Sequence, residues 1–161
     1  MRFQVLFAWC VVSAVSALAA PEYPQMGPDI FDAHAPAEKL IAAAVFKAKQ
    51  EHQRVLLLFG ANWCPWCRRL HKALDSEPIV TARLKKNFVL VFIDANTRND
   101  KKRNSAVIER YGNPLQYGLP VFVVLDGDGK QLTTQETASL DGGTGTEVAE
   151  KLAAFLDRSA G

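Results

Sequence analysis

The chain has 161 residues, of which 48% are hydrophobic and 22% charged, and its formal net charge is +2. These values are typical of one globular domain with a sizeable core. The charge is too small to indicate binding to nucleic acid or to an anionic membrane surface.

The first 19 residues have the pattern of a secretory signal peptide. Arg2 and the amino terminus are positive, an apolar stretch follows over 5–15, and residues 17–19 read Ala-Leu-Ala, a small-x-small cleavage pattern. The alternative is a retained membrane anchor, but the uninterrupted part of the apolar stretch is shorter than the roughly 20 residues that a spanning helix needs. Cleavage would remove Cys10 and leave two cysteines in a protein of an oxidising compartment.

A proline-rich lead-in, predicted over 20–36, comes next. It has no periodic pattern, so we expect extended chain that is ordered only where it touches the domain, which should occupy 37–161. Apolar residues then recur at helical spacing over 37–50, which predicts the first helix. An unbroken apolar run over 55–59 predicts a buried strand.

Two cysteines follow that strand in the sequence Trp-Cys-Pro-Trp-Cys, over 63–67. Proline is tolerated in a first helical turn because its missing N–H would have no intrahelical acceptor there. Cys64 and Cys67 are therefore expected on the opening turn of a helix, where free backbone N–H groups favour a thiolate at Cys64. We expect Cys64 to be the sulfur that solvent reaches. A disulfide that closes so short a loop stabilises the folded protein only slightly. We therefore expect the cysteine pair to serve in redox chemistry.

The remaining elements follow from the same patterns. The helix with the cysteines should end near Asp75, with Ser76 as the N-cap of another helix over 77–86. Further expectations are a buried strand over 88–93, a polar segment over 96–104 leading into a helix that ends near 111, a strand over 121–125, a hairpin turn over 126–129, a partner strand over 130–134 and a last helix over 146–157. This order predicts an α/β fold with a central mixed sheet and helices on both faces, with parallel strands early and an antiparallel hairpin late.

The chain resembles the thioredoxin superfamily over most of this domain. The motif at 63–67 after a buried strand and the sequence Gly-Leu-Pro over 118–120 before the third strand carry the resemblance. Exported relatives that look similar include small bacterial periplasmic thioredoxin-like proteins and domains of thiol:disulfide interchange proteins. The resemblance implies the thioredoxin fold, a cis Leu119–Pro120 bond beside the cysteine pair, and a place in the bacterial periplasm, across the inner membrane.

We expect thiol–disulfide exchange with protein substrates, in which Cys64 is the nucleophile and Cys67 resolves the mixed disulfide. Other residues are expected to support the pair or to contact substrate: Trp63, Pro65, Trp66 and Pro120 as supporting residues, and Leu119 and Trp66 as substrate contacts. Trp63 should pack beside the pair and shield it. We expect no cofactor besides the redox-active disulfide. We also expect a monomer, no nucleic acid, and an upstream redox partner that can be membrane-bound.

Two differences, one from thioredoxin and one from the large periplasmic oxidases, bear on the kind of activity expected. Leu58 stands six residues before the first cysteine, where thioredoxin has a buried aspartate, so the proton-relay carboxylate of that family is missing. The segment between Cys67 and Pro120 is too short for the extra helical domain of the large periplasmic oxidases. The missing carboxylate predicts slower turnover than that of thioredoxin, and the short segment favours a reductase or isomerase over a dedicated oxidase.

Two alternatives remain open at the level of sequence. Cys64, Cys67 and His71 could hold a metal ion, as in a metallochaperone or a redox-inactive binding module. A basic cluster, Arg98, Lys101, Lys102 and Arg103, is interpreted as a solvated helix face, with docking of an acidic redox partner as the rival interpretation.

Overall fold

The computed structural model describes residues 20–161, so the predicted signal peptide lies outside the described residues. Its centre is a four-stranded sheet in the order β2-β1-β3-β4. The strands are β1 (Arg54–Gly60), β2 (Phe88–Asp94), β3 (Val121–Leu125) and β4 (Gln131–Glu136). β1 pairs with β2 in parallel, whereas β3 is antiparallel to both β1 and β4. The predicted mixed sheet, with its late antiparallel hairpin, is confirmed.

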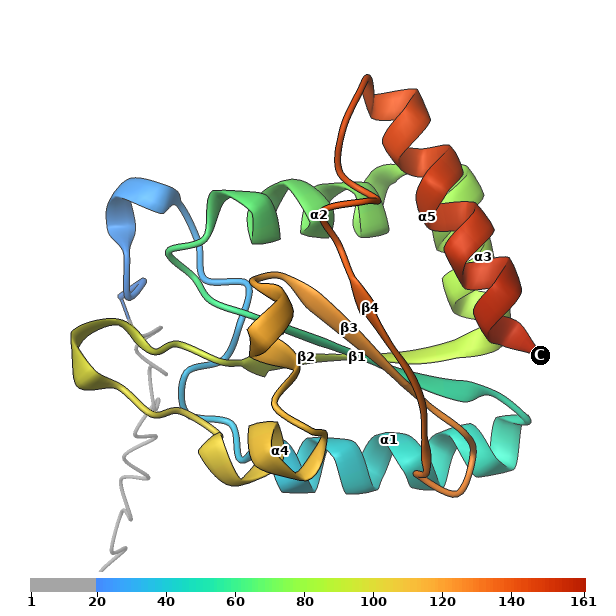
Figure 1. Ribbon diagram of the computed structural model, residues 1–161, viewed down its shortest axis with the longest axis horizontal. Helices are drawn as coiled ribbons and strands as arrows, with labels where there is room; N and C mark the ends of the chain where they lie inside the picture. The colour runs from blue at the N-terminus through green and yellow to red at the C-terminus, as the bar shows by residue number, and fades with distance from the viewer. Residues whose placement is uncertain (1–19) are drawn as a thin grey trace, which may run out of the picture.

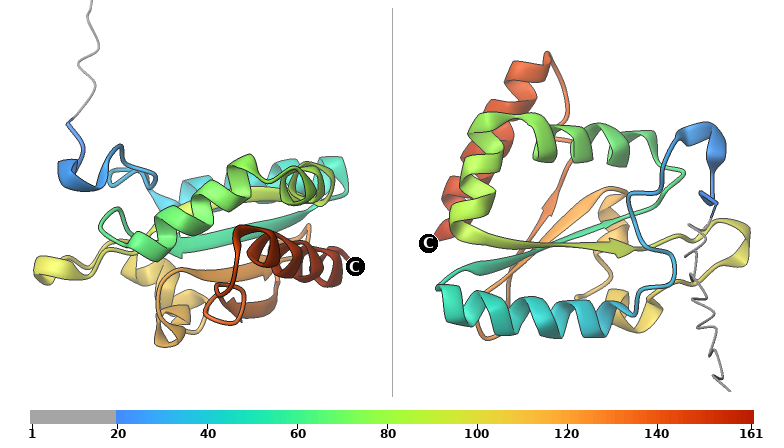
Figure 2. Two further views of the ribbon diagram at one scale, coloured as in Figure 1. Left: turned by 90° about the horizontal axis from the view of Figure 1, so that it is seen from above. Right: turned by 180° about the vertical axis from the view of Figure 1, so that it is seen from behind.

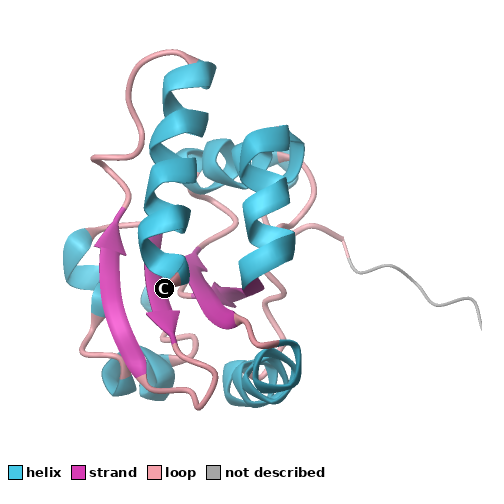
Figure 3. Cartoon of the chain, turned by 90° about the vertical axis from the view of Figure 1, so that its right-hand side faces the viewer, coloured by secondary structure: helices cyan, strands magenta, loops and turns pink. Residues whose placement is uncertain are grey.

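Helices cover both faces of this sheet, as Figure 1 shows. On one side lie α2 (Pro65–Ser76), α3 (Pro78–Asn87) and α5 (Gly145–Ala160), and on the other α1 (Ala37–Glu51) and α4 (Ser105–Arg110). Figure 3 gives a view from the side on which the chain ends, with α5 and α3 in front of the sheet. Within residues 20–161, none of the helices has the length and apolarity to cross a membrane.

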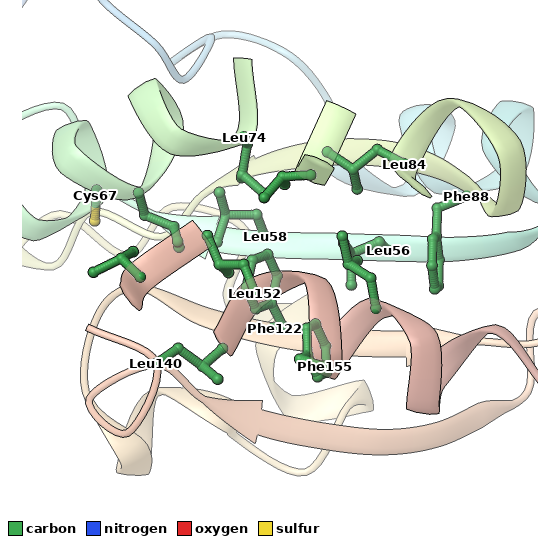
Figure 4. Close-up of a cluster of buried hydrophobic side chains, with 14 of the residues drawn as sticks. Leu56, Leu58, Cys67, Leu74, Leu84, Phe88, Phe122, Leu140, Leu152 and Phe155 are labelled. Atoms are coloured by element: carbon green, nitrogen blue, oxygen red, sulfur yellow. The ribbon is translucent and has the colours of Figure 1, made fainter. Parts of the chain in front are cut away.

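The unbroken apolar run of β1 is explained by its position inside the molecule. Successive side chains of a strand point to opposite faces. Leu56 and Leu58 accordingly belong to the core under α2, α3 and α5, which Figure 4 shows, while Leu57 belongs to the core under α1 and α4. Because both faces of β1 are covered by helices, both sets of positions must be apolar.

One predicted cap is wrong. Ser76 is the last residue of α2, and its Oγ donates to the Lys72 carbonyl at 2.7 Å, so it does not cap the following helix. Glu77 occupies the cap position of α3 without a side-chain hydrogen bond. The fixed φ of Pro78 suits the first position of a helix, so α3 starts there. The Ser76 hydroxyl makes its hydrogen bond within its own helix, α2.

The lead-in over 20–36 packs on the domain. It includes a 3-10 turn at Pro24–Met26, and the ring of Phe31 is fully buried. A Cβ atom at Gly60 would collide with that ring, so only glycine permits this close approach. The lead-in therefore contributes to the core beneath the redox motif.

Removing the N-cap of α5 should destabilise the fold measurably. Thr144 Oγ1 accepts a hydrogen bond from the Glu147 N–H at 3.4 Å, and the Glu147 carboxylate accepts one from the Thr144 N–H at 2.6 Å. Thr144→Ala is expected to lower the free energy of unfolding by about 1 kcal/mol in urea titrations. Thr146→Ala, in the first turn of the same helix, is the matched control and should cost nothing. Equal losses in both variants would contradict this role of the cap.

Candidate active site

The structure places both sulfurs on the opening turn of α2. Cys64 is the N-cap residue, Pro65 is the first residue of the helix, and the two cysteines form a disulfide with Cα atoms 5.2 Å apart. Cys64 Sγ also accepts a hydrogen bond from the Cys67 N–H at 3.1 Å. A free N–H of the first turn thus points at the sulfur on which negative charge would develop.

The two cysteines are less accessible to solvent than their sequence pattern predicts. The exposed fraction of Cys64 is 2% and that of Cys67 is 0%. Cys64 Sγ lies 3.8 Å from the Leu119 carbonyl oxygen, so the loop before β3 covers it. The expectation that solvent reaches Cys64 is therefore wrong for this oxidised form, because the cover comes from residues more than fifty positions away in the chain.

The loop beside the disulfide contains the peptide bond that the resemblance singled out. The Leu119–Pro120 bond is cis, and Pro120 is buried while Leu119 is half-buried. The Pro120 carbonyl accepts a hydrogen bond from Thr137 Oγ1 at 2.5 Å, which ties the loop to the chain after β4. Gly118 has φ of 86°, a conformation that favours glycine.

A groove of about 310 Å³ opens next to this loop. Its walls include Trp66, Tyr117, Leu119 and Asp141. The two aromatic side chains are 53% and 54% exposed, respectively, so they form a rim that an incoming chain would meet. Trp66 and Leu119 were predicted from the sequence as substrate contacts, whereas Tyr117 was not, because its only signal was an aromatic residue directly before the Gly-Leu-Pro sequence.

Trp66 is held in its exposed position by a neighbour. The Arg69 guanidinium lies 4.0 Å from the centre of the Trp66 ring and pairs with Asp141 at 3.1 Å. A cation over an aromatic face is attractive, and the carboxylate fixes where the cation sits. Helix α2 and the loop before α5 thus meet at the groove.

Trp63 directly precedes the pair and contacts the segment that follows β2. It is half-buried and packs against the core cluster that contains both cysteines. Its Nε1 donates to Asn96 Oδ1 at 2.9 Å, and the Arg98 guanidinium lies 3.6 Å from its ring centre. Asn96 follows β2 and was not singled out from the sequence, because an asparagine in a polar segment gives no signal.

The basic cluster is not a solvated helix face, so that interpretation is wrong. It precedes α4, and three of its four members contact other groups: Arg98 stacks on Trp63, Lys101 pairs with Glu22, and Arg103 pairs with both Glu22 and Asp94, while Lys102 is exposed. Asp94 and Glu22 come from the end of β2 and from the lead-in. Only the tertiary fold brings these acids to the cluster.

Two carboxylates in this network have shifted pKa values. Burial raises the pKa of Asp94 above its ordinary value, although hydrogen bonds from Arg103 act in the opposite direction. Burial also acts to raise the pKa of Glu22, but hydrogen bonds from Lys101 and Arg103 outweigh it, so this pKa is lowered. Arg103 therefore compensates a carboxylate whose side chain has no solvent contact.

The metal site considered from sequence is not assembled. Among residues 20–161, no three His, Cys, Asp or Glu side chains are grouped as ligands for a metal ion. The His71 ring instead lies 5.3 Å from that of Phe92. Leu58 is fully buried in the core beside Cys67, so its position offers no carboxylate to the sulfurs.

Comparison with known proteins agrees with this geometry. The sequence model of the family described as Thioredoxin-like matches residues 37–127. A solved disulphide isomerase from Xylella fastidiosa Temecula1 is 33% identical, with 80% of this chain and 95% of that chain covered and a TM-score of 0.68. The C-terminal domain of Neisseria meningitidis DsbD, in its oxidised form, shares the fold at 23% identity, with 78% and 97% covered and a TM-score of 0.54.

A curated relative is similar over a shorter stretch. It is the thiol:disulfide interchange protein DsbD of Photorhabdus laumondii, 29% identical over 84 residues. The match covers 52% of this chain and 14% of that protein. Taken with the family match over residues 37–127 and the paired sulfurs on α2, these similarities show that the chain belongs to the thioredoxin-like family.

Proposed function

We propose that this chain is a thiol:disulfide oxidoreductase that exchanges disulfides with protein substrates. The observation on which the proposal rests is the Cys64–Cys67 disulfide on the first turn of α2, beside a groove with exposed aromatic side chains. In the reduced enzyme, the Cys64 thiolate attacks a substrate disulfide, forms a bond to one sulfur and releases the other as a thiolate. The Cys67 thiolate then attacks Cys64 Sγ, which closes the enzyme disulfide and releases the second substrate thiolate.

The balance of this exchange is two electrons from the enzyme to the substrate, and the reverse order of steps oxidises a substrate dithiol. The Cys67 N–H and the N-terminus of α2 stabilise the attacking thiolate. The redox-active disulfide is the only redox group that this chemistry needs, and no cofactor is proposed.

We propose that the reaction runs as reduction or isomerisation. Between α2 and β3 the chain forms only α3, β2, α4 and two 3-10 turns, without an inserted helical domain. The names of the relatives, a disulphide isomerase and a thiol:disulfide interchange protein, point the same way. Measuring the equilibrium with glutathione decides the direction, since each tenfold change in that constant corresponds to about 30 mV.

An oxidising compartment fits this chemistry, and we propose the bacterial periplasm. The predicted signal peptide over 1–19 supports export, and the relatives come from bacteria. We further propose that the chain is a monomer that exchanges electrons with an upstream redox partner, which can be membrane-bound. Extended substrate would lie in the groove next to the Leu119 backbone, with Trp66 at its rim.

Replacing the resolving cysteine should trap the intermediate. Reduced Cys67→Ser is expected to accumulate mixed disulfides through Cys64 when it is mixed with a disulfide-containing protein such as insulin, because no second thiol remains to release the substrate. Non-reducing gels and mass spectrometry measure these adducts. The control is the double variant Cys64→Ser/Cys67→Ser, which should form none. Absence of adducts in the single variant, or equal amounts in both, would refute the mechanism.

A further inference from the structure

We infer that the lead-in over 20–36 is a positioning element of the active site, and that it acts on Trp63 through Asn96. The inference rests on the proposed function and adds a role for residues that have no part in the exchange steps. We call the hydrogen-bonded set Glu22, Tyr23, Asn96 and Trp63 the relay. Figures 1 and 2 show the lead-in, in blue, beside the loops that precede α2 and follow β2.

The Asn96 side chain, which is fully buried, is the centre of the relay. Its Oδ1 accepts hydrogen bonds from Trp63 Nε1 at 2.9 Å and from the Arg98 N–H at 3.0 Å. Its Nδ2 donates to Tyr23 Oη at 3.1 Å and to Glu22 Oε1 at 3.3 Å. A flipped amide would place donor against donor on one side and acceptor against acceptor on the other. Together with the Arg98 N–H, the two acceptors of the lead-in therefore fix the amide orientation that holds Trp63.

Glu22 is itself held firmly in place. Its carboxylate pairs with Lys101 and accepts hydrogen bonds from both terminal nitrogens of Arg103. Each of the two bonds from Arg103 is 3.0 Å long. Since Arg103 also binds the buried Asp94, Glu22 is connected through Arg103 to the end of β2. The acceptor that faces Asn96 is thus part of a network of ion pairs that includes a buried carboxylate.

The same lead-in also holds the residue before Trp63. The buried side chain of Asn62 accepts hydrogen bonds from the Ile30 and Phe31 N–H groups, both at 2.9 Å, and donates to the Phe31 carbonyl at 2.8 Å. Arg68 donates to the Pro28 and Asn62 carbonyls at 2.7 and 2.8 Å. The backbone on one side of Trp63 and the acceptor of its indole are therefore both fixed by one segment.

Trp63 precedes the nucleophile, so its placement affects where Cys64 Sγ stands when it attacks. Freeing the indole from Asn96 should allow the ring to move and should misalign Cys64 relative to the incoming disulfide. Small displacements of reacting groups reduce rates steeply. Glu22 and Tyr23 are thus positioning residues, which act through Asn96 and touch neither substrate nor sulfur.

Two double variants test the relay against a merely structural role. Tyr23→Phe/Glu22→Gln and Tyr23→Phe/Glu22→Ala both lose the phenol hydroxyl and the ion pairs of Glu22, but only the first keeps an acceptor oxygen for Asn96. We expect kcat/KM for insulin reduction to be lower in the alanine version by on the order of tenfold, within the hundredfold that a displacement of about 1 Å can cost. Equal kcat/KM in the two versions would overturn the inference.

Fluorescence reports on the indole independently of activity. With Trp9 and Trp66 replaced by phenylalanine, Trp63 is the sole tryptophan of the chain. The alanine version should then show a shifted Trp63 emission and a smaller change on reduction of the disulfide than the glutamine version. Asp128→Asn, which removes an exposed ion pair with Lys49, is the control and should alter neither readout. Identical spectra in the two versions would also contradict the relay.

A second pair of variants, which moves the negative charge from Glu22 to position 96, tests the relay if the alanine version does not fold. Asn96→Asp should still accept from Trp63 but would place its second oxygen against the Glu22 carboxylate, so kcat/KM should fall. Glu22→Gln in the same chain should restore it, because the glutamine amide can donate to the new carboxylate. Failure of this rescue would overturn the inference. If the parent chain does not reduce insulin, the proposed function fails, whereas the Trp63 spectra still decide the relay.

Discussion

Cys64→Ser is expected to abolish disulfide exchange, with insulin reduction reduced at least about a thousandfold, since loss of a nucleophile in other enzymes costs on the order of 10⁶ in kcat. The physical reason is that a serine hydroxyl is not ionised at neutral pH and cannot form the mixed disulfide. Insulin reduction with dithiothreitol as the electron donor, corrected for the rate without enzyme, measures the effect.

The fold of Cys64→Ser should survive, because the disulfide closes a loop too short to constrain the unfolded chain much. Its urea midpoint should therefore stay close to that of the reduced parent. Asp128→Asn serves as the activity control and should retain the parent rate, since its ion pair with Lys49 lies on the exposed surface. Retention of a tenth or more of the parent activity in Cys64→Ser would rule out this residue as the nucleophile.

Arg103→Met should cost about 3–5 kcal/mol of unfolding free energy at neutral pH, the range observed when one partner of a buried ion pair is removed. The Asp94 side chain has no solvent contact, and Arg103 Nη1 lies 2.5 Å from its Oδ2. Without this cation the carboxylate would remain buried and charged. Urea denaturation followed by circular dichroism measures the loss.

This loss should shrink as the pH is lowered. Burial already raises the pKa of Asp94, and removal of Arg103 would raise it further. Between the pKa of the unfolded state and the higher pKa of the folded state, the folded state binds more protons, so stability rises as the pH falls. In Arg103→Met/Asp94→Asn both charges are absent, so most of the stability should return. A cost below 1 kcal/mol, or one independent of pH, would contradict the role assigned to Arg103.

Every strand and every long helix of residues 37–161 was predictable, because each has a characteristic pattern of apolar and polar residues that are close in the sequence. The apolar run of β1 reflects burial on both of its faces. The helical spacing of apolar residues in α1 reflects burial on one face. The placement of both cysteines on one turn was equally local, since it depends on Pro65 and on the spacing of the pair. The misplaced cap at Ser76 shows the limit of such rules where two helices adjoin.

The sequence by itself determined the elements, the family resemblance and the paired sulfurs. The tertiary structure alone decided that Leu119 covers Cys64, that Tyr117 joins the groove, and that Glu22 and Asp94 meet at Arg103. The physical reason is that local geometry is fixed by neighbouring residues, whereas a buried hydrogen bond needs a donor and an acceptor brought together by packing. Asn62 and Asn96 look like ordinary loop residues until the lead-in supplies their partners.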